Sequence, residues 1–242
     1  MPHTLFISDL HLSEDQPHIT QLFLNFSRNT APKAEALYIL GDLFEYWAGD
    51  DDRNTPFHQQ IIRAIRVVSQ QGTPVFIMHG NRDFLMSEQL AQDCNATILP
   101  DPTVIDLYGT PTLLTHGDAL CTDDVQYQAF RKQVREPAWC ANFVAQPLPQ
   151  RKAQIEQLRK MSEDQKQTKA IEIMDVNLIS VTDLFRKHHY PLMIHGHTHR
   201  QKHHLHEVDE KSCERWVLGD WHETGNALKC DNAGCSFQTI NL

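Results

Sequence analysis

The feature that most constrains the fold is a short apolar run that recurs along the chain and each time ends in polar residues. Such runs cover residues 4–7, 36–40, 74–78, 112–114 and 191–194. Runs that are apolar on both faces are typical of strands buried inside a layered α/β protein. In such folds, ligands gather beyond the carboxyl ends of the strands. We therefore expect the five polar strand ends to face one pocket.

The residues that follow these runs are types that bind metal ions. Seven of them are candidate ligands: Asp9, His11, Asp42, Asn81, His116, His197 and His199. The first two are separated by one residue, as are the last two, which places both side chains of a pair on one face of an extended chain. Oxygen and imidazole donors without thiolate suit Mn²⁺, Fe²⁺ or Zn²⁺. Two such ions about 3.5 to 4 Å apart can clamp a phosphate and generate hydroxide, so the set predicts phosphoester hydrolysis.

Helical patterns fill the intervals between the runs. Residues 21–28, 57–71 and 87–94 separate the early strands, and residues 125–134, 151–162 and 164–181 lie in the long interval after His116. Pro137, Pro147 and Pro149 break the first helix of this interval from the second. We expect a single domain over residues 1–242 with an inserted helical cap at about 123–185. Residues 214–241 contain β-like alternation and should complete a second sheet, which gives two sheets flanked by helices.

Charge and cysteine content narrow the class of protein further. The net charge of −9 argues against binding along a nucleic acid backbone. Residues 131–170 differ, because nine Lys or Arg against four Asp or Glu give a local +5 and leave −14 elsewhere, so this segment should face anions. No run approaches the roughly 18 apolar residues of a transmembrane helix. Six cysteines without a C-x-x-C pair predict reduced thiols and a cytoplasmic protein.

A lone D-x-H or Gly-Asp is usually a turn or a cap, but the combination is far more specific. The chain carries D-x-H, G-D, G-N, H-G and G-H-x-H in that order, at residues 9–11, 41–42, 80–81, 116–117 and 196–199. This order resembles the calcineurin-like metallophosphoesterases. The resemblance implies a four-layer αββα sandwich with two metal ions. It assigns one ion to Asp9, His11, Asp42 and His199, and the other to Asp42, Asn81, His116 and His197, with Asp42 bridging.

One position departs from that pattern. Many members of the superfamily carry G-N-H and use the histidine as an acid near the leaving oxygen, whereas this chain has Gly80-Asn81-Arg82-Asp83. Arginine does not give up its proton near neutral pH, so Arg82 can bind charge but is a poor general acid. A leaving phosphate of a pyrophosphate needs charge stabilisation more than a proton. We therefore assign Asn81 and Arg82 to catalysis and expect pyrophosphate cleavage.

A closer resemblance covers almost the whole chain. The segments DLH (9–11), GDLFE (41–45), HGNRDF (79–84), CTDD (121–124) and HGHTHR (195–200) are similar to the UDP-2,3-diacylglucosamine hydrolases of lipid A synthesis. This implies water attack on the α-phosphorus, which yields UMP and 2,3-diacylglucosamine 1-phosphate (lipid X), with two divalent ions, most often Mn²⁺. It also implies peripheral association with the cytoplasmic face of the inner membrane, with no nucleic acid and no obligate protein partner. The implied substrate contacts are Asn81, Arg82, Asp124, Ser162, Lys166, Lys169 and His197.

Several features remain open to more than one interpretation. Trp139 and Phe143 adjoin the basic segment, where they either hold acyl chains or pack the cap onto the core. Residues 50–52, three consecutive aspartates, are interpreted as a solvated loop. The histidines at 188, 189, 203, 204 and 206 are interpreted as surface residues, and His79 and His195 as groups that orient ligands. Two other functions stay possible: a pyrophosphatase or phosphodiesterase for soluble nucleotides, and a non-catalytic scaffold for partner proteins.

Overall fold

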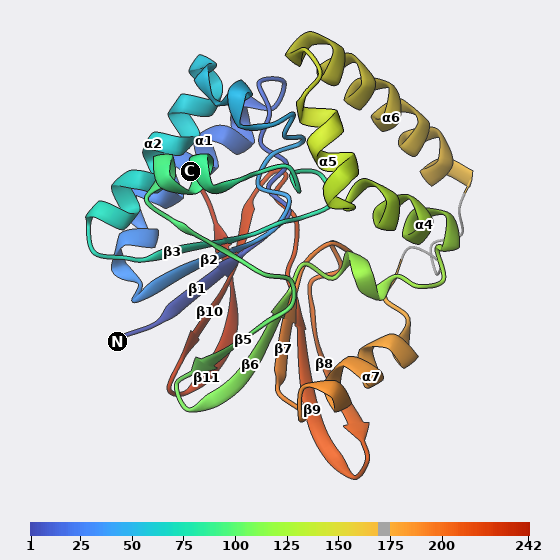
Figure 1. Cartoon of the computed structure of the whole chain (residues 1–242). Coiled ribbons are helices and arrows are strands. Elements are labelled where there is room, and N and C mark those ends of the chain that lie inside the picture. The colour runs from blue at the N-terminus through green and yellow to red at the C-terminus, as the bar shows by residue number, and fades with distance from the viewer. Residues whose placement is uncertain (169–174) are drawn as a thin grey trace.

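Two β-sheets lie face to face at the centre of the protein and helices cover their outer sides (Figure 1). The computed structural model describes residues 1–168 and 175–242, with side chains described for residues 1–161 and 175–242. The layering confirms the expected mixed α/β class with two sheets flanked by helices.

The first sheet carries three of the five predicted strands. Its order is β11-β10-β1-β2-β3-β4, with β1 to β4 parallel and β10 antiparallel to β1. The strands are β1 (Thr4–Ile7), β2 (Ala36–Leu40), β3 (Val75–Met78), β4 (Thr97–Leu99), β10 (Gly225–Asp231) and β11 (Gly234–Ile240). Because β1, β2 and β3 are parallel neighbours, their carboxyl ends lie side by side at one edge.

The second sheet carries the other two predicted strands. Its order is β5-β6-β7-β9-β8, in which β6, β7 and β9 are parallel. The strands are β5 (Thr103–Leu107), β6 (Thr110–Thr115), β7 (Leu192–His195), β8 (Lys202–Val208) and β9 (Lys211–Val217). All five predicted strands are therefore present, three in one sheet and two in the other.

Alternate residues of the strands enter different parts of the core. Leu5 and Ile7 of β1 pack with the helices that cover the first sheet, whereas Phe6 packs between the two sheets. The helices on the first sheet are α1 (Pro17–Asn29), α2 (Pro56–Gln70) and α3 (Glu88–Cys94), and α7 (Leu178–Lys187) covers the second sheet. Three short 3₁₀ turns are η1 (Ala31–Lys33), η2 (Asp50–Asn54) and η3 (Asp118–Leu120). Burial on both faces explains why β1 is apolar throughout.

Three further helices lie beyond the carboxyl ends of the strands (Figure 1). They are α4 (Val125–Val134), α5 (Pro137–Val144) and α6 (Leu148–Thr168). The sequence predicted α4 and most of α6 but missed α5, which begins at Pro137, where proline suits the first helical turn. The predicted helix over 164–181 is wrong at residues 175–177, which are not helical; Asn177 caps α7 instead. Residues 169–174 of that prediction lie outside the described residues.

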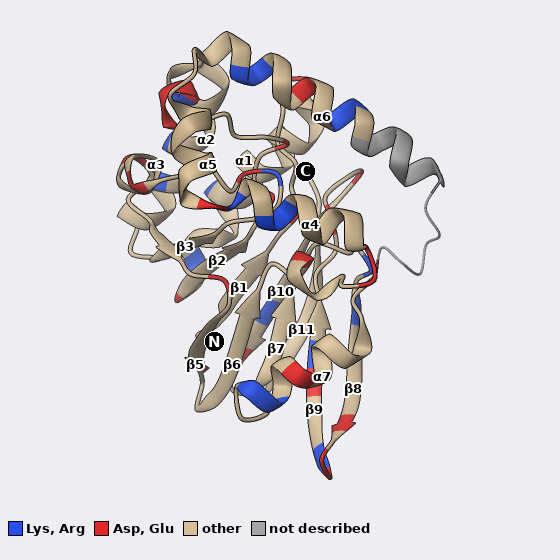
Figure 2. Cartoon of the chain, turned by 45° about the vertical axis from the view of Figure 1, so that its right-hand side comes forward, with Lys and Arg blue, Asp and Glu red and all other residues tan. Residues whose placement is uncertain are grey.

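Part of the positive charge expected to face anions holds this region to the body instead. Arg151 is 1% exposed and donates to the Ala48 carbonyl (2.5 Å) and to the Asp51 carboxylate. Lys152 Nζ lies 2.6 Å from Asp52 Oδ1. Figure 2 marks the Lys and Arg positions along α4 and α6, and Arg159 Nη2 of α6 also lies 2.8 Å from Glu45 Oε1. Such pairs leave less net charge for an external anion than the sequence count suggests.

Two further expectations fail. The C-terminal segment does not simply complete the second sheet, because only β9 joins it while β10 and β11 extend the first.

Cys230 and Cys235 are not free thiols: they face each other across the β10–β11 hairpin with Cα atoms 4.1 Å apart and form a disulfide. The spacing C-x₄-C places two cysteines opposite each other only when a tight hairpin forms between them, and a search for C-x-x-C overlooks that arrangement.

Candidate active site

The strand ends bring all seven predicted ligands together. Asp9 and His11 follow β1, Asp42 follows β2, and Asn81 follows β3. His116 follows β6, and His197 and His199 follow β7, so the two sheets contribute to one site between their edges. Backbone bonds fix the first two loops against each other, because Asp9 N donates to Gly41 O (3.1 Å) and His11 N donates to Asp42 O (3.0 Å).

One group of donor atoms is formed by Asp9, His11 and His199. Their ligand atoms all lie within 4.8 Å of one another. Nε2 of His11 is 3.4 Å from Nε2 of His199, which in turn is 3.4 Å from Asp9 Oδ1. One carboxylate and two imidazoles that converge in this way match the donor types of a divalent transition metal site.

A second group is formed by Asp9, Asp42 and His116, again within 4.8 Å. Asn81 adds its side-chain oxygen, which lies 3.0 Å from His116 Nε2 and 2.9 Å from His197 Nδ1. The carboxylate of Asp42 has one oxygen 3.8 Å from His11 Nε2 and the other 3.8 Å from His116 Nε2. Asp42 therefore lies between the two groups, as a bridging ligand must. Asp9 belongs to both groups by distance, which the sequence did not indicate.

The backbone at these ligands is unusual. Five of the seven have positive φ: Asp9 (55°), His11 (50°), Asp42 (52°), His197 (67°) and His199 (58°). Left-handed backbone is uncommon for residues other than glycine and costs on the order of 1 to 3 kcal/mol each. Strain of this kind concentrates at functional sites, where the surrounding structure maintains it.

The electrostatics of the cluster favour bound positive charge. Burial lowers the pKa of the His116 imidazole, but the carboxylates of Asp42 and Asp9 outweigh it and raise that pKa to about 9. Burial raises the pKa of Asp9, yet the His199 and His116 side chains hold it below its ordinary value. Burial lowers the pKa of His199, and hydrogen bonds to Asp220 and Asp9 raise it to about 10. A bound cation would replace these protons, because an imidazole binds metal in its neutral form.

The side chains that orient the imidazoles were missed by the sequence interpretation. Nδ1 of His11 lies 3.1 Å from Glu45 Oε2, and Nδ1 of His199 lies 3.1 Å from Asp220 Oδ2. Nδ1 of His116 donates to the Leu40 carbonyl at 2.8 Å. Acceptors at Nδ1 leave Nε2 free for a metal and fix the ring orientation. Glu45 was present in the GDLFE segment, but only the folded chain shows that it faces His11.

Two further buried carboxylates, also missed, hold the loops that carry the ligands. Asp83 accepts from the backbone N–H groups of Gly80 (2.8 Å) and Leu43 (2.8 Å), which ties the loop after β3 to the loop after β2. Burial and the nearby charge of Asp42 raise the pKa of Asp83 to about 6. Asp118 accepts from Tyr127 (2.6 Å) and Arg131 (2.7 Å), so α4 is joined to the loop after His116.

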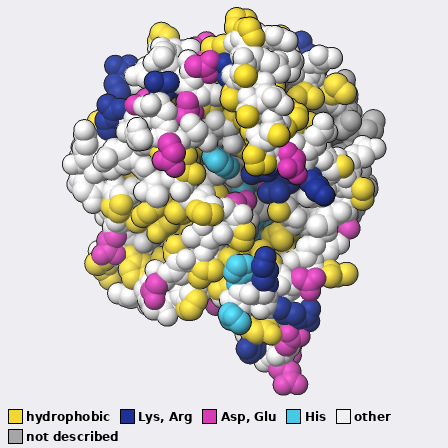
Figure 3. Space-filling model, in the orientation of Figure 1, with side chains coloured by type: hydrophobic (Ala, Val, Ile, Leu, Met, Phe, Trp, Pro, Cys, Tyr) yellow, Lys and Arg dark blue, Asp and Glu magenta, His cyan; other side chains and the backbone are white. Residues whose placement is uncertain are grey.

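A cavity of about 670 Å³ connects the ligands to the helices above them. Its polar end is lined by His11, Asp42, Asn81, His197 and His199, and its other end by apolar side chains of α4, α5 and α6. In Figure 3 the surface is hollowed here, with histidine, acidic and basic side chains beside hydrophobic ones. The rings of Trp139 and Phe143 stack with centroids 4.8 Å apart, and both side chains line the cavity.

The predicted substrate contacts are only partly described. Arg82 lines the cavity next to Asn81, and its Nη1 lies 3.6 Å from Glu45 Oε1. Asp124 also lines the cavity and caps α4 by accepting from Tyr127 N (3.0 Å). Ser162 and Lys166 lie in α6, but their side chains are outside the described set, as is the whole of Lys169.

Asp50 and Asp52 are structural rather than part of a solvated loop, whereas Asp51 is exposed to solvent and also binds Arg151. Asp50 accepts from Trp47 Nε1 (2.9 Å) and Leu90 N (2.9 Å), and Asp52 is 1% exposed beside Lys152. The sequence could not show these contacts because their partners are distant in the chain. The His79 ring contacts the Met86 carbonyl (2.8 Å) rather than a candidate ligand, whereas the His195 ring lies against Gly117, in the loop that carries His116.

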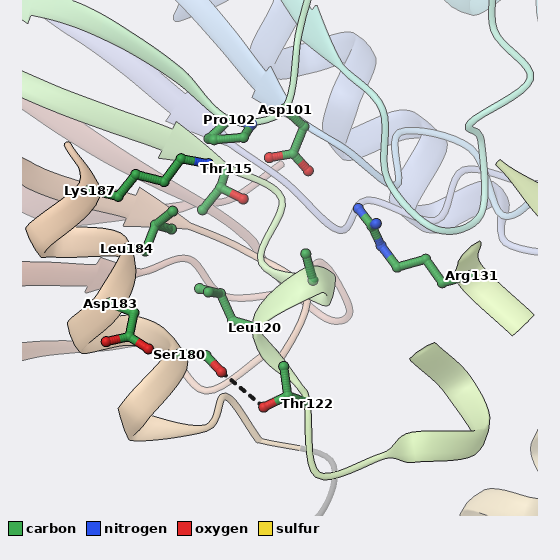
Figure 4. Close-up of a pocket in the computed structure, with 11 residues that line it drawn as sticks. Asp101, Pro102, Thr115, Leu120, Thr122, Arg131, Ser180, Asp183, Leu184 and Lys187 are labelled. Carbon is green, nitrogen blue, oxygen red and sulfur yellow. Dashed lines mark hydrogen bonds between the residues drawn. The ribbon is translucent and has the colours of Figure 1, made fainter. Parts of the chain in front are cut away.

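A second, smaller hollow lies between η3 and α7 (Figure 4). Its volume is about 350 Å³, and it includes Asp101, Thr115, Arg131 and Lys187 in its lining. None of the residues predicted to bind metal or substrate lines it. The larger cavity is therefore the candidate active site.

Comparisons with known proteins agree with this geometry. Residues 2–201 match the model of the calcineurin-like phosphoesterase family. A UDP-2,3-diacylglucosamine hydrolase of Aromatoleum aromaticum is 54% identical over 95% of this chain and 94% of that protein, and one of Stenotrophomonas maltophilia is 48% identical over 98% of both. One of Marinobacter nauticus is 50% identical over 91% of this chain and 90% of its own length. A solved archaeal phosphodiesterase aligns over 99% of both chains at 14% identity with a TM-score of 0.43.

Proposed function

Because the chain belongs to the calcineurin-like phosphoesterase family, we propose that it hydrolyses UDP-2,3-diacylglucosamine to UMP and 2,3-diacylglucosamine 1-phosphate, a step of lipid A synthesis. The name shared by relatives that match nearly end to end supports this substrate. The observation that carries the proposal is the larger cavity, in which a polar cluster of metal-ligand types opens into an apolar chamber. A substrate with a pyrophosphate at one end and acyl chains at the other matches both parts.

The metal-ligand cluster fits divalent ions. We propose that it binds two of them and that Mn²⁺ is the favoured metal. Such ions polarise phosphoryl oxygens and lower the pKa of water. The chain itself holds the phosphate: Asn81 and Arg82 line the cavity at the cluster, and the guanidinium can donate two parallel hydrogen bonds to phosphate oxygens. A guanidinium is a poor proton donor near neutral pH, so Arg82 would stabilise the charge of a phosphate leaving group by hydrogen bonding.

The apolar chamber is proposed to bind the acyl chains. We retain one domain over residues 1–242 with a helical cap at about 123–185, in which α4, α5 and α6 roof the cavity and α7 packs on the second sheet. Phe130, Leu158 and Met161 line the cavity and remain well exposed, which suits contact with a lipid surface. Within the described part of the chain, no helix has the length and apolar character needed to cross a bilayer.

We propose that the protein acts at the cytoplasmic face of the inner membrane without an obligate protein partner. The cations that hold the cap to the body cannot also neutralise anionic lipid, so apolar contact should contribute more than charge. A myristoyl-sized chain alone gives only marginal, reversible membrane binding. Association should therefore be reversible and only weakly salt-dependent.

The decisive experiment is incubation with UDP-2,3-diacylglucosamine and Mn²⁺, followed by mass analysis for UMP. The deacylated substrate is measured in parallel, because about 0.8 kcal/mol per buried CH₂ predicts a large loss of kcat/KM when the chains are removed. Equal kcat/KM for the two substrates would favour the second candidate, a pyrophosphatase of soluble nucleotides. A pyrophosphatase of soluble nucleotides would need the same metal cluster, but its substrate would not occupy the apolar chamber.

The chamber itself is tested by Trp139→Ala. Loss of a central aromatic contact should lower kcat/KM about tenfold on the acylated substrate and leave it unchanged on the deacylated one. Val144→Ala is the matched control, because Val144 lies on the same helix, is 42% exposed and does not line the cavity. Equal effects on both substrates would show that Trp139 serves only to pack the cap.

A further inference from the structure

A buried arginine lies beneath the loops that carry the histidine ligands. Arg215 of β9 is 3% exposed and forms no ion pair with a carboxylate in the described part of the chain. Its guanidinium donates instead to two imidazoles: Nη1 to His195 Nε2 at 3.0 Å and Nε to His206 Nε2 at 3.1 Å. An arginine can only donate, so both Nε2 atoms accept and each ring carries its proton on Nδ1.

That tautomer gives His195 a donor directed at the site. Nδ1 of His195 lies 2.9 Å from the Gly196 carbonyl, which it can bind only when Nδ1 is protonated. The same peptide unit carries the His197 N–H, which donates to both carboxylate oxygens of Asp9, at 3.1 and 2.9 Å. A peptide unit is planar, so fixing its carbonyl also fixes the N–H that positions Asp9.

The ring of His195 also supports the other histidine loop. Gly117 follows His116 with φ of 108°, and a Cβ there would lie 2.8 Å from His195 Nδ1. The Gly196 N–H donates to the His116 carbonyl at 3.0 Å. The loops of His116 and His197 therefore both rest on one imidazole ring, whose orientation is set from below by Arg215.

We propose that Arg215 is a positioning residue for the metal centre: its donation to Nε2 of His195 selects the tautomer whose Nδ1–H holds the Gly196–His197 peptide against Asp9. The inference rests on the proposed metal binding but not on the identity of the substrate. Without the arginine, only the Gly196 carbonyl favours the proton on Nδ1, so the Nε2 tautomer, in which the bond to Gly196 is lost, becomes more populated. Outer partners of metal ligands typically contribute about 10-fold to 100-fold in metal affinity.

The test begins with Arg215→Met, which keeps an unbranched apolar stem but removes the donors. Long-range ¹H–¹⁵N spectra of metal-free protein labelled in histidine should show His195 protonated on Nδ1 in the wild type and on Nε2, at least in part, in the variant. Calorimetry should show Mn²⁺ binding weakened at least about 10-fold. Arg215→Lys retains a donor and should keep the wild-type tautomer and Mn²⁺ affinity. If a folded Arg215→Lys protein loses the Nδ1 proton of His195, the proposal is overturned, so the test does not depend on whether Arg215→Met folds.

Two controls separate positioning from packing. His206→Phe removes the other acceptor of Arg215 and should lower stability without changing Mn²⁺ affinity or the His195 tautomer. In a His195→Asn background the amide N–H can replace Nδ1–H at Gly196, so adding Arg215→Met should cause no further loss of Mn²⁺ affinity. The proposal is overturned if Arg215→Met melts at a lower temperature but keeps the wild-type tautomer and Mn²⁺ affinity. Failure to hydrolyse the lipid substrate would overturn the proposed function alone.

Discussion

Gly80→Ala should remove metal binding without unfolding the protein. An ideal Cβ on Gly80 would lie 2.0 Å from Asp42 Oδ1 and 2.3 Å from Asp42 N, whereas real Cβ contacts below 3.0 Å are essentially never observed. The backbone φ of Gly80 is outside the left-handed region, so an alanine at this position is disfavoured by steric overlap and not by backbone strain. The Asp42 carboxylate must therefore move by about 1 Å, well beyond the roughly 0.2 Å tolerance of a metal–ligand distance.

The consequences can be separated by measurement. Misplacement by about 1 Å can cost on the order of 100-fold, equivalent to about 2.7 kcal/mol, and Asp42 lies between both groups of ligands, so turnover should fall by at least that factor. Overpacking lowers stability by about 1 to 3 kcal/mol, which a folded domain of this size survives. Calorimetric titration with Mn²⁺ measures the first effect and thermal unfolding by circular dichroism measures the second.

Gly219→Ala is the matched control, since its Cβ would meet the Gln201 and Asn226 side chains at 3.3 Å and its φ is also outside the left-handed region. That variant should bind Mn²⁺ as the wild type does. A folded Gly80→Ala protein with Mn²⁺ affinity within a factor of three of wild type would refute the reasoning. It would show that Asp42 can shift and still bind, or that it is not a ligand.

Three further outcomes are expected. Asp42→Ala should reduce turnover to background even at saturating Mn²⁺, because two cations then lack the carboxylate between them; near wild-type activity would contradict the two-metal assignment. Arg82→Lys should lower kcat while the fold and Mn²⁺ content persist, since an ammonium cannot form the paired bonds of a guanidinium; an Arg82→His variant that matched wild type on the natural substrate would contradict the leaving-group argument. Burial lowers the pKa of His58, so the stability that this neutral imidazole contributes is complete above the unfolded-state pKa of about 6.5 and is lost as the pH falls below that value. The free energy of unfolding in urea should therefore drop less between pH 7.5 and 5.5 in His58→Phe than in wild type. An equal drop in the two proteins would show that His58 does not contribute to the pH dependence.

The strands and the candidate ligands that follow them could be predicted from the sequence because both depend on local pattern. A strand buried on both faces must be apolar throughout, and the polar residues that end it are then conspicuous, as at Asp9 and Asp42. The strands that were missed lack this pattern. β4 has three residues, and β8 exposes Lys202, His203 and Glu207 to solvent.

What could not be predicted depends on contacts between distant segments. Glu45 faces His11 and Asp220 faces His199 only after the loops meet, and neither spacing carries a motif. The same holds for Arg151 and Lys152, which count as surface charge in the sequence but bind Asp51 and Asp52 in the folded protein. Composition gives the sign of a segment's charge but not how much of it remains unpaired.

The left-handed backbone at five of the ligands has an evolutionary consequence. Glycine adopts that conformation without the penalty of a Cβ and asparagine with less of it, so at Asp9, His11, Asp42, His197 or His199 either residue would relieve strain. Only the need for a metal-binding donor atom at each position opposes such a substitution. The substitution would therefore raise stability at the expense of activity. A lineage released from hydrolysis should therefore drift toward glycine or asparagine at these positions while its strands persist. Descendants that keep the fold but have lost the chemistry could be recognised by that drift alone.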